Sequence, residues 1–359
     1  MSIIDGFLVQ GTGLAKNLTQ IDWVRRQLID LAGIDPYPGT LNLDLLDEAS
    51  RERWQNWCNM SGDVIEPEDV GFCRARCYPA RIEGRIPAAV LLPESTDYPA
   101  YKMELVSALP IRTHLSLCDN SRVRVSLCQP LVAKAILFDI DGTLVDSVGA
   151  YLEVARIAAE PFGIEVSAEH VRHSLSTGNN FWRGVIPQDR RDGDAILKAM
   201  SEHAAREWPR VLREFGTVFK GVAKTLDALE SRGIRLGIVS GARPEVMELL
   251  REEGILDRFD TVILGGDVSK GKPDPEGICK GLSRLKVQPD MALYVGDTPI
   301  DIQASHSAGV RAVSVLTGAA DSAELSAYGP ERLISSHAKL PTIVANRSTY
   351  SASIDDVLQ

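Results

Sequence analysis

The chain has 359 residues, of which 44% are hydrophobic and 25% are charged, and its formal net charge is -10. This length exceeds what one hydrophobic core usually supports, so we expect at least two domains. The apolar share excludes disorder of the whole chain. The acidic balance argues against a nucleic-acid partner, because the phosphate backbone would be repelled. Small phosphorylated molecules are more compatible with this charge as ligands than nucleic acids are.

The chain also lacks the usual signs of a membrane or secreted protein. No apolar run approaches the roughly 20 residues that span a bilayer, and residues 1–13 do not join a basic start to a long apolar stretch. The six cysteines are not spaced like a disulfide scaffold. We therefore expect a cytoplasmic protein with reduced thiols and no membrane partner.

In residues 1–130 short apolar runs alternate with turn residues, which is typical of a β-rich domain. One helical stretch, Gln20–Gly33, interrupts them with apolar residues at helical spacing and a glycine stop. We predict a small β-barrel with one or two helices. Its strands are expected near Ile3–Val9, Thr40–Leu45, Phe72–Ile82, Ala88–Leu92, Met103–Leu109 and Val123–Leu127.

From residue 131 to residue 344 buried strands alternate with helices, a pattern that predicts a parallel α/β sheet. Examples of the strands are Ala135–Phe138, Ile234–Val239 and Ala292–Val295. A mainly helical stretch at about 147–217 is too long for a loop, so we interpret it as a helical cap beside the active site. Residues 345–359 are serine-rich and weakly patterned, and we expect them to form a disordered tail.

Two carboxylates, Asp139 and Asp141, directly follow the first of these strands. The carboxyl end of a parallel strand faces the crevice where such sheets bind ligands. One carboxylate can attack a phosphoryl group to give an aspartyl phosphate, while the second protonates the leaving oxygen and then activates water. Gly142 permits the sharp turn that follows, and Thr143 completes the run Asp-Ile-Asp-Gly-Thr.

Three further segments supply complementary groups at later strand ends and loops. Ser240 and Gly241 offer a hydroxyl and backbone N–H groups that can hold phosphate oxygens at a helix start. Lys272, between Gly271 and Pro273, supplies a cation on a loop stiffened by prolines. Asp297 and Asp301 add the oxygen ligands that Mg²⁺ requires.

These four elements, in this order, resemble the four motifs of the haloacid dehalogenase superfamily, which has a Rossmann-like parallel sheet. The resemblance covers roughly residues 132–344. It implies that Asp139 is the nucleophile, Asp141 the general acid/base and Lys272 the stabilising cation. It also implies phosphate binding by Ser240, Gly241 and Thr143, and Mg²⁺ held by Asp139, Asp141, Asp297 and Asp301.

Two details of the resemblance indicate the type of reaction and the class of substrate. The second carboxylate, Asp141, points to phosphoryl transfer, because dehalogenases of the superfamily lack this acid/base. Phosphomutases of the superfamily also have this acid/base, so a phosphomutase is an alternative to a phosphatase. A helical insert just after the first motif resembles the subgroup with helical C1-type caps, which act on small phosphate esters.

In the first part, Thr40 and Asn42 flank one apolar residue on an expected strand and so face the same side. Neutral oxygen-bearing side chains of this kind can hold a magnesium ion that carries nucleotide phosphates. Taken alone, the segment Tyr37–Leu43 is better interpreted as a hairpin turn.

Other segments extend this pattern, in the order and spacing of the archaeal CTP-dependent riboflavin kinases. They are Gly11-Thr12-Gly13, Cys77–Ile82, Ala88–Pro93 and Glu104–Val106. The resemblance implies a cradle-loop barrel that binds CTP and riboflavin, with Mg²⁺ on Thr40 and Asn42 and Glu104 as the base. It implies nucleotide contacts from Gly11, Gly13 and Lys16, although the basic and aromatic residues that follow the glycines in the family are replaced here.

The combination suggests an enzyme of flavin metabolism, in which a magnesium-dependent phosphatase is fused to a CTP-dependent riboflavin kinase that makes FMN. The phosphatase substrate would be a ribityl-pyrimidine precursor of riboflavin or FMN itself. The alternative is a phosphatase of a sugar, polyol or nucleotide phosphate with a barrel that binds a ligand without catalysis.

Overall fold

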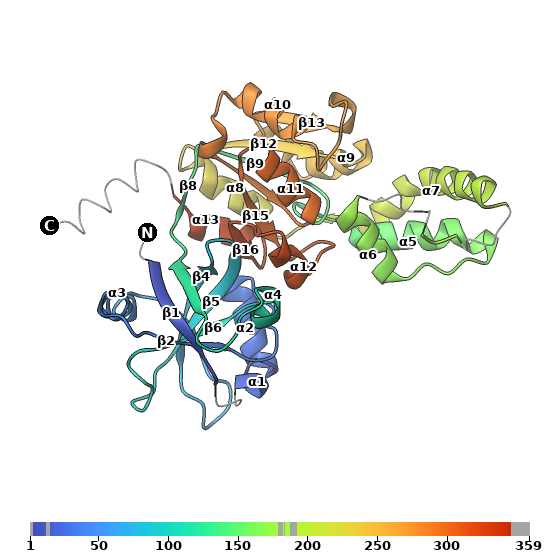
Figure 1. The fold of residues 1–359 in the computed structure, drawn as a ribbon. Helices are drawn as coiled ribbons and strands as arrows, with labels where there is room; N and C mark the ends of the chain where they lie inside the picture. Colours follow the sequence, from blue (N-terminus) through green and yellow to red (C-terminus); the bar gives the residue numbers. More distant parts are fainter. Residues whose placement is uncertain (1–2, 12–14, 179–181, 183, 187–191, 346–359) are drawn as a thin grey trace. The chain divides into compact units, whose positions relative to one another are not determined.

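A computed structural model describes residues 3–11, 15–178, 182, 184–186 and 192–345. The chain folds into two compact units (Figure 1). The first contains residues up to Pro130 together with Asp321–Ser335, and the second contains Leu131–Ala320 together with residues from Ser336 onward. The predicted division at residues 130 and 131 differs from this arrangement in one segment, Asp321–Ser335. The predicted tail beyond residue 345 lies outside the described residues, as does Gly13.

The first unit contains the predicted β-barrel. Among the described residues, six strands close an antiparallel barrel in the order β4-β5-β6-β2-β1-β7, because β7 pairs back onto β4, and β3 pairs with β4 outside the ring. Inward residues alternate with outward ones, as Ile4 and Leu8 do on β1. The strands are β1 (Ile3–Val9), β2 (Leu41–Asp44), β3 (Asp63–Ile65), β4 (Ala75–Ile82), β5 (Ile86–Pro93), β6 (Lys102–Val106) and β7 (Arg122–Leu127).

Four helices accompany these strands: α1 (Ala15–Leu18), α2 (Asp22–Ala32), α3 (Glu48–Cys58) and α4 (Ile111–His114). Helix α2 lies inside the predicted stretch and ends at Gly33, which adopts φ of +67°. Helix α3 was not predicted. It starts at Asp47, whose side chain accepts the Ser50 N–H at 2.8 Å, and it buries Trp54 and Trp57. Few other apolar residues mark its buried face, so its periodicity is weak in the sequence.

The segment Asp321–Ser335 joins the barrel unit through polar contacts. It contains α12 (Ser322–Ala327) and β16 (Arg332–Ile334). The Ser322 hydroxyl donates to the Gly33 carbonyl at 3.0 Å and accepts the Asp35 N–H at 3.2 Å. Arg81 forms an ion pair with Glu331 at 3.1 Å. The two Ser322 bonds lie just after the C-terminal end of α2, so this late segment stabilises an early turn.

The second unit contains a parallel sheet whose strands run in the order β13-β12-β9-β14-β15. All four residues of β9 are buried, as expected for a strand covered on both faces. Strand β9 lies between β12 and β14, so its carboxyl end opens at the point where the strand order reverses. The strands are β9 (Ala135–Phe138), β12 (Arg235–Ser240), β13 (Thr261–Leu264), β14 (Ala292–Gly296) and β15 (Arg311–Val315).

Helices accompany this sheet, and a helical insert follows β9 (Figure 1). The insert contains α5 (Val148–Ala159), α6 (Ala168–Thr177) and α7 (Gly193–Phe215), and it leaves and re-enters through the paired strands β10 (Val145–Asp146) and β11 (Thr217–Val218). The remaining helices are α8 (Val222–Glu230), α9 (Pro244–Glu252), α10 (Glu276–Leu285), α11 (Pro299–Ser307) and α13 (Leu340–Ile343). Short strands β8 (Leu131–Val132) and β17 (Val344–Ala345) pair at the edge of the unit.

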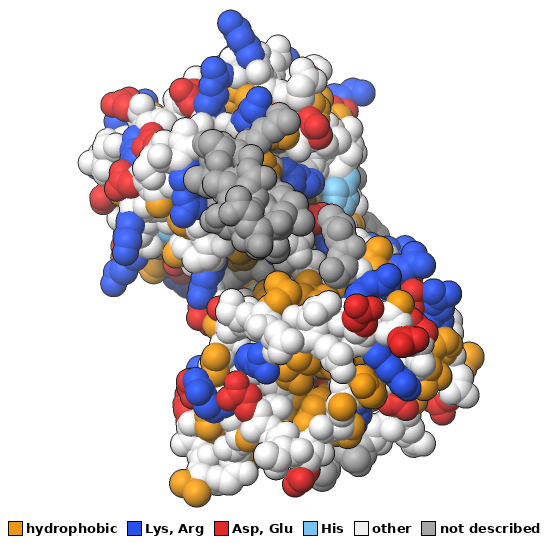
Figure 2. Space-filling view, turned by 90° about the vertical axis from the view of Figure 1, so that its left-hand side faces the viewer, with side chains coloured by type: hydrophobic (Ala, Val, Ile, Leu, Met, Phe, Trp, Pro, Cys, Tyr) orange, Lys and Arg blue, Asp and Glu red, His pale blue; other side chains and the backbone are white. Residues whose placement is uncertain are grey.

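Two surface properties bear on possible partners. None of the helices in the described part of the chain is both long enough and apolar enough to span a bilayer. On the face shown in Figure 2, side chains of lysine and arginine are interspersed with those of aspartate and glutamate. This face therefore carries charges of both signs.

His337 links pH to the stability of the second unit. It is 2% exposed, and its Nδ1 lies 3.1 Å from the Thr225 hydroxyl on α8. Burial lowers the pKa of His337 from 6.5 to about 4. Between these two values the unfolded chain binds a proton that the folded chain does not. The contribution of neutral His337 is therefore complete above pH 6.5 and is lost as the pH falls toward 4.

We predict that, relative to His337→Gln, the wild-type protein loses about 3 kcal/mol of unfolding free energy between pH 7 and pH 4, because one pKa unit corresponds to about 1.4 kcal/mol. Urea unfolding at a series of pH values measures the difference. His114→Gln, at an exposed position, is the matched control. A wild-type minus variant difference that stays constant with pH would contradict the prediction.

Candidate active site

The order of the strands brings three of the predicted site residues together. Phe138 pairs with Ile238 on β12 and with Val295 on β14, so Asp139, Ser240 and Asp297 all follow at the same edge of the sheet. They line one cavity of about 200 Å³. Sequence positions more than 150 residues apart thus meet because parallel strands end side by side.

Lys272 is the cation of this cavity. Its Nζ lies 2.9 Å from Asp139 Oδ1 and 2.7 Å from Asp301 Oδ1, and it donates to the Tyr294 hydroxyl at 3.1 Å. Although burial lowers the pKa of Lys272, the carboxylates of Asp139 and Asp301 raise it well above its usual value. Lys272 therefore stays charged. Lys270, the neighbouring candidate, is exposed and lies 4.0 Å from Asp274.

Asp301 is held from two sides. Its second carboxylate oxygen accepts the Thr298 N–H at 3.0 Å and the Thr298 hydroxyl at 2.5 Å, which caps helix α11. With its other oxygen on Lys272, Asp301 positions the lysine that faces Asp139.

Asp297 lies in a cradle formed by two glycines. A Cβ on Gly318 would lie 1.8 Å from Asp297 Oδ2, and a Cβ on Gly142 would lie 2.4 Å from the same atom. The Ala319 N–H donates to this oxygen at 2.8 Å. Thr143, predicted to bind phosphate, is fully buried and donates its hydroxyl to Asp297 Oδ1 at 3.4 Å. The sequence alone gave no signal for Gly318 and Ala319, since they act through the backbone.

The second carboxylate, Asp141, receives hydrogen bonds from two side chains that sequence reasoning did not select. The Ser147 hydroxyl donates to Oδ1 at 2.6 Å, and the Tyr151 hydroxyl donates to Oδ2 at 3.3 Å. Burial raises the pKa of Asp141 to about 6, and the carboxylate of Asp139 adds to this effect. A carboxyl with this pKa can carry a proton near neutral pH, as a general acid must.

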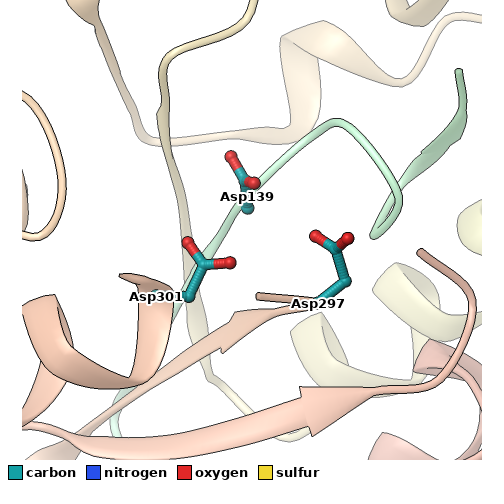
Figure 3. Close-up of side chains that lie close together, drawn as sticks. All are labelled: Asp139, Asp297 and Asp301. Carbon is teal, nitrogen blue, oxygen red and sulfur yellow. The ribbon is translucent and has the colours of Figure 1, made fainter. Parts of the chain in front are cut away.

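The carboxylates Asp139, Asp297 and Asp301 are suited to a divalent cation. All three are buried, and each offers an oxygen within 4.8 Å of the others (Figure 3). Asp139 Oδ1 is buried without a hydrogen-bond donor in suitable geometry. Burial raises the pKa of Asp297 well above its usual value, and the carboxylates of Asp301 and Asp139 raise it further. A hard cation with oxygen ligands would offset this concentration of negative charge.

The remaining lining of the cavity comes from both the sheet and the helical insert. Val148 and Tyr151 of α5 and Leu175 of α6 contribute from the insert, while Ile300 comes from α11. The cavity thus has a charged floor at the strand ends and mainly apolar walls. A cation held by the carboxylates, together with Lys272, would make this floor suited to a compact ligand with one strongly anionic end.

The predicted barrel residues also meet in one cavity, of about 340 Å³. Thr40, Asn42, Glu104, Gly11 and Lys16 all line it. Asn42 and Glu104 are direct partners across β2 and β6, so their side chains share one face. The Asn42 amide donates to the Thr40 hydroxyl at 3.1 Å. A Cβ on Gly11 would lie 2.5 Å from the Asn42 amide nitrogen, so glycine permits this close approach.

A second barrel cavity of about 290 Å³ adjoins the first, and the two share Gly39, Thr40 and Arg112. Its other walls are mainly apolar and include Leu41, Ile82 and Leu105. Glu104 forms an ion pair with Lys102 at 3.3 Å beside the first cavity. The barrel therefore offers one polar and one more apolar compartment that meet at Thr40.

Comparison with known proteins identifies both units. The model of the haloacid dehalogenase-like hydrolases matches residues 136–315. The chain belongs to this family. Residues 8–127 match the model of the CTP-dependent riboflavin kinase domain, which is described as Domain of unknown function DUF120. The two predicted resemblances are thereby confirmed, and the chain joins a phosphatase of the haloacid dehalogenase type to a riboflavin kinase-like domain.

The curated relatives of the second unit include phosphatases. A phosphoglycolate phosphatase of Nitrosospira multiformis is 31% identical over 186 residues, which cover 50% of this chain and 82% of the relative. Pyrophosphatase PpaX of Oceanobacillus iheyensis is 29% identical and covers 59% of this chain and 97% of the relative. The structure of a haloacid dehalogenase-like hydrolase from Bacteroides fragilis is 28% identical, with a TM-score of 0.50, 58% of this chain covered and 99% of the other.

We predict that Gly318→Ala displaces the Asp297 carboxylate and weakens metal binding. At about 100 times the dissociation constant a bound ion stabilises by about 2.7 kcal/mol, which corresponds to a rise in Tm of roughly 5 °C or more in a unit of this size. The variant should show less than half of the rise that the wild type shows when MgCl₂ replaces EDTA. Gly266→Ala is the control, because a Cβ there meets open space. Equal rises in Tm for Gly318→Ala and Gly266→Ala would contradict a role of Gly318 in placing the Asp297 carboxylate.

Proposed function

We propose that the second unit is a magnesium-dependent phosphatase that hydrolyses a small phosphate monoester through an aspartyl phosphate on Asp139. The observation that carries the proposal is the pairing of Asp139 with the Lys272 ammonium at 2.9 Å, beside an Asp141 whose pKa is about 6. A carboxylate held beside an ammonium group, and a carboxyl that binds a proton more readily than usual, are thus combined in one cavity.

In the first step an oxygen of Asp139 forms a bond to phosphorus, and the bond between phosphorus and the ester oxygen breaks. The leaving oxygen takes its electron pair and receives the proton of Asp141, so an alcohol departs. In the second step water attacks phosphorus and gives a proton to Asp141. The bond between phosphorus and Asp139 breaks, and inorganic phosphate is released.

The other residues support these steps by charge and hydrogen bonding. Lys272 offsets negative charge on the nucleophile and the phosphoryl group. Ser240 and the N–H groups that follow it, at the start of the α9 segment, are suited to phosphate oxygens. Asp139 and Asp297, with Asp301 behind them, would hold Mg²⁺, which would supply further charge stabilisation when bound.

We predict that Asp139→Asn lowers kcat for phosphate release by about 10³-fold or more, because the amide cannot act as the nucleophile. Phosphate release from a panel of esters with MgCl₂ measures it. The panel includes phosphoglycolate, FMN and a ribityl-pyrimidine phosphate, so it also identifies the substrate class. Asp146→Asn, an exposed position on β10, is the control and should retain activity. Undiminished hydrolysis by Asp139→Asn would refute the assignment of the nucleophile.

We further propose that the barrel transfers a phosphoryl group from CTP to riboflavin. The shared wall of its two cavities at Thr40 supports this reading, because a nucleotide in the polar compartment and an acceptor in the apolar one would meet there. Thr40 and Asn42 would hold the metal of the nucleotide, and Glu104 would take the proton of the acceptor hydroxyl. Together with the phosphatase, this activity would favour a role in flavin metabolism.

The barrel proposal predicts that the Asp139→Asn variant forms FMN from riboflavin and CTP. This variant is used because its second unit should no longer hydrolyse the FMN that is formed. Adding Asn42→Ala or Glu104→Gln should reduce the rate at least about 10²-fold. Asn56→Ala, exposed on α3, is the control. Binding of both ligands by calorimetry without FMN formation would instead identify a binding module.

A further inference from the structure

The helical insert reaches the candidate acid through the first turn of one helix. Ser147 is the residue before α5, and Tyr151 lies one turn later, so both side chains emerge on the same face. Each hydroxyl donates to a different oxygen of Asp141, at 2.6 Å and 3.3 Å. Two bonds on opposite oxygens fix both the position and the rotation of the carboxyl group.

The Tyr151 hydroxyl is in turn positioned by packing within the insert. The Tyr151 ring lies 4.5 Å from the ring of Trp208 on α7, with an angle of 37° between the two planes. Trp208 is 1% exposed, and the guanidinium of Arg243, just before α9, lies 5.8 Å from the centre of its ring. The tyrosine is thus held by a buried contact between the two long helices of the insert.

We propose that Tyr151, together with Ser147, is a positioning residue that orients the carboxyl of Asp141 for proton transfer to the leaving group. The proposal rests on the phosphatase function given above. In the step that releases the alcohol, Asp141 gives its proton to the ester oxygen as the bond between that oxygen and phosphorus breaks. A displacement of about 1 Å in such a group can cost about 10²-fold in rate. Packing of α5 against α7 would thereby set the geometry of the acid.

The competing explanation is that the Tyr151 hydroxyl only satisfies the hydrogen bond that a buried phenol requires. The two roles differ in how the rate depends on the leaving group. An alkoxide is a poor leaving group and needs the proton, whereas p-nitrophenolate departs without it. A positioning role therefore predicts damage that is selective for alkyl esters, while a structural role predicts equal damage to both.

The test compares Tyr151→Phe with the wild type on an alkyl phosphate monoester and on p-nitrophenyl phosphate, both with MgCl₂. First-turnover rates are needed, so that hydrolysis of the aspartyl phosphate does not mask the step. Phenylalanine keeps the ring that packs on Trp208. We expect the alkyl ester rate to fall about 10–100-fold with KM changed less than about 2-fold, and the p-nitrophenolate burst rate to fall less than about 3-fold.

Further variants distinguish the loss of a hydroxyl group from a loss of protein stability. Ser147→Ala should reproduce the selective loss, and Ser147→Thr, which keeps the hydroxyl, should restore most of the activity. Tyr328→Phe, at an exposed tyrosine outside the site, is the matched control and should leave both rates unchanged. An equal loss on both esters, or no loss in Tyr151→Phe, would overturn the positioning role. A wild type that cleaves neither ester would overturn the phosphatase proposal itself, and this inference with it.

Discussion

The ion pairs of one buried lysine organise the second unit. Lys272 lies between Asp139 and Asp301, and each of these carboxylates would otherwise carry an uncompensated charge in the interior. Removing one partner of such a buried set usually costs several kcal/mol, because the other charges stay behind without compensation. The Tyr294 hydroxyl on β14, which accepts from Lys272 and donates to the Val239 carbonyl, connects the cluster to β12 on the other side of β9. The same contacts that hold the sheet together therefore hold the reactive groups.

The two units solve a similar problem with different sheets. In the second unit, parallel strands end side by side and collect carboxylates from distant parts of the sequence at one edge. In the barrel, antiparallel neighbours place Asn42 opposite Glu104, so the polar groups meet across a strand pair. The first arrangement concentrates negative charge, whereas the second distributes mainly neutral oxygen ligands. Under the proposed functions, this difference would suit an ion bound by the protein in the second unit and an ion bound together with a nucleotide in the barrel.

Much of this organisation could be predicted from the sequence, because the informative residues directly follow apolar strands. Asp139 and Asp297 are examples, and the structure gathers them with Ser240 and Lys272 in one cavity. The site residues that could not be predicted are those whose role depends on contacts formed only in the folded chain. Ser147 and Tyr151 carry no special signal until α5 brings them to Asp141, and Ala319 acts through its backbone N–H. Helix α3 was missed because two tryptophans mark its buried face, and other apolar residues on it are few.

The contacts of Ser322 with Gly33 and Asp35 bear on how the first unit is assembled from the chain. Because Asp321–Ser335 belongs to the first unit, this unit is built from two stretches of the chain that are far apart in the sequence. A chain cut after Pro130 would lack Ser322, so the turn that follows α2 would lose these two hydrogen bonds. During synthesis the turn after α2 therefore gains the hydrogen bond from Ser322 to Gly33 only once a segment 289 residues later has been made.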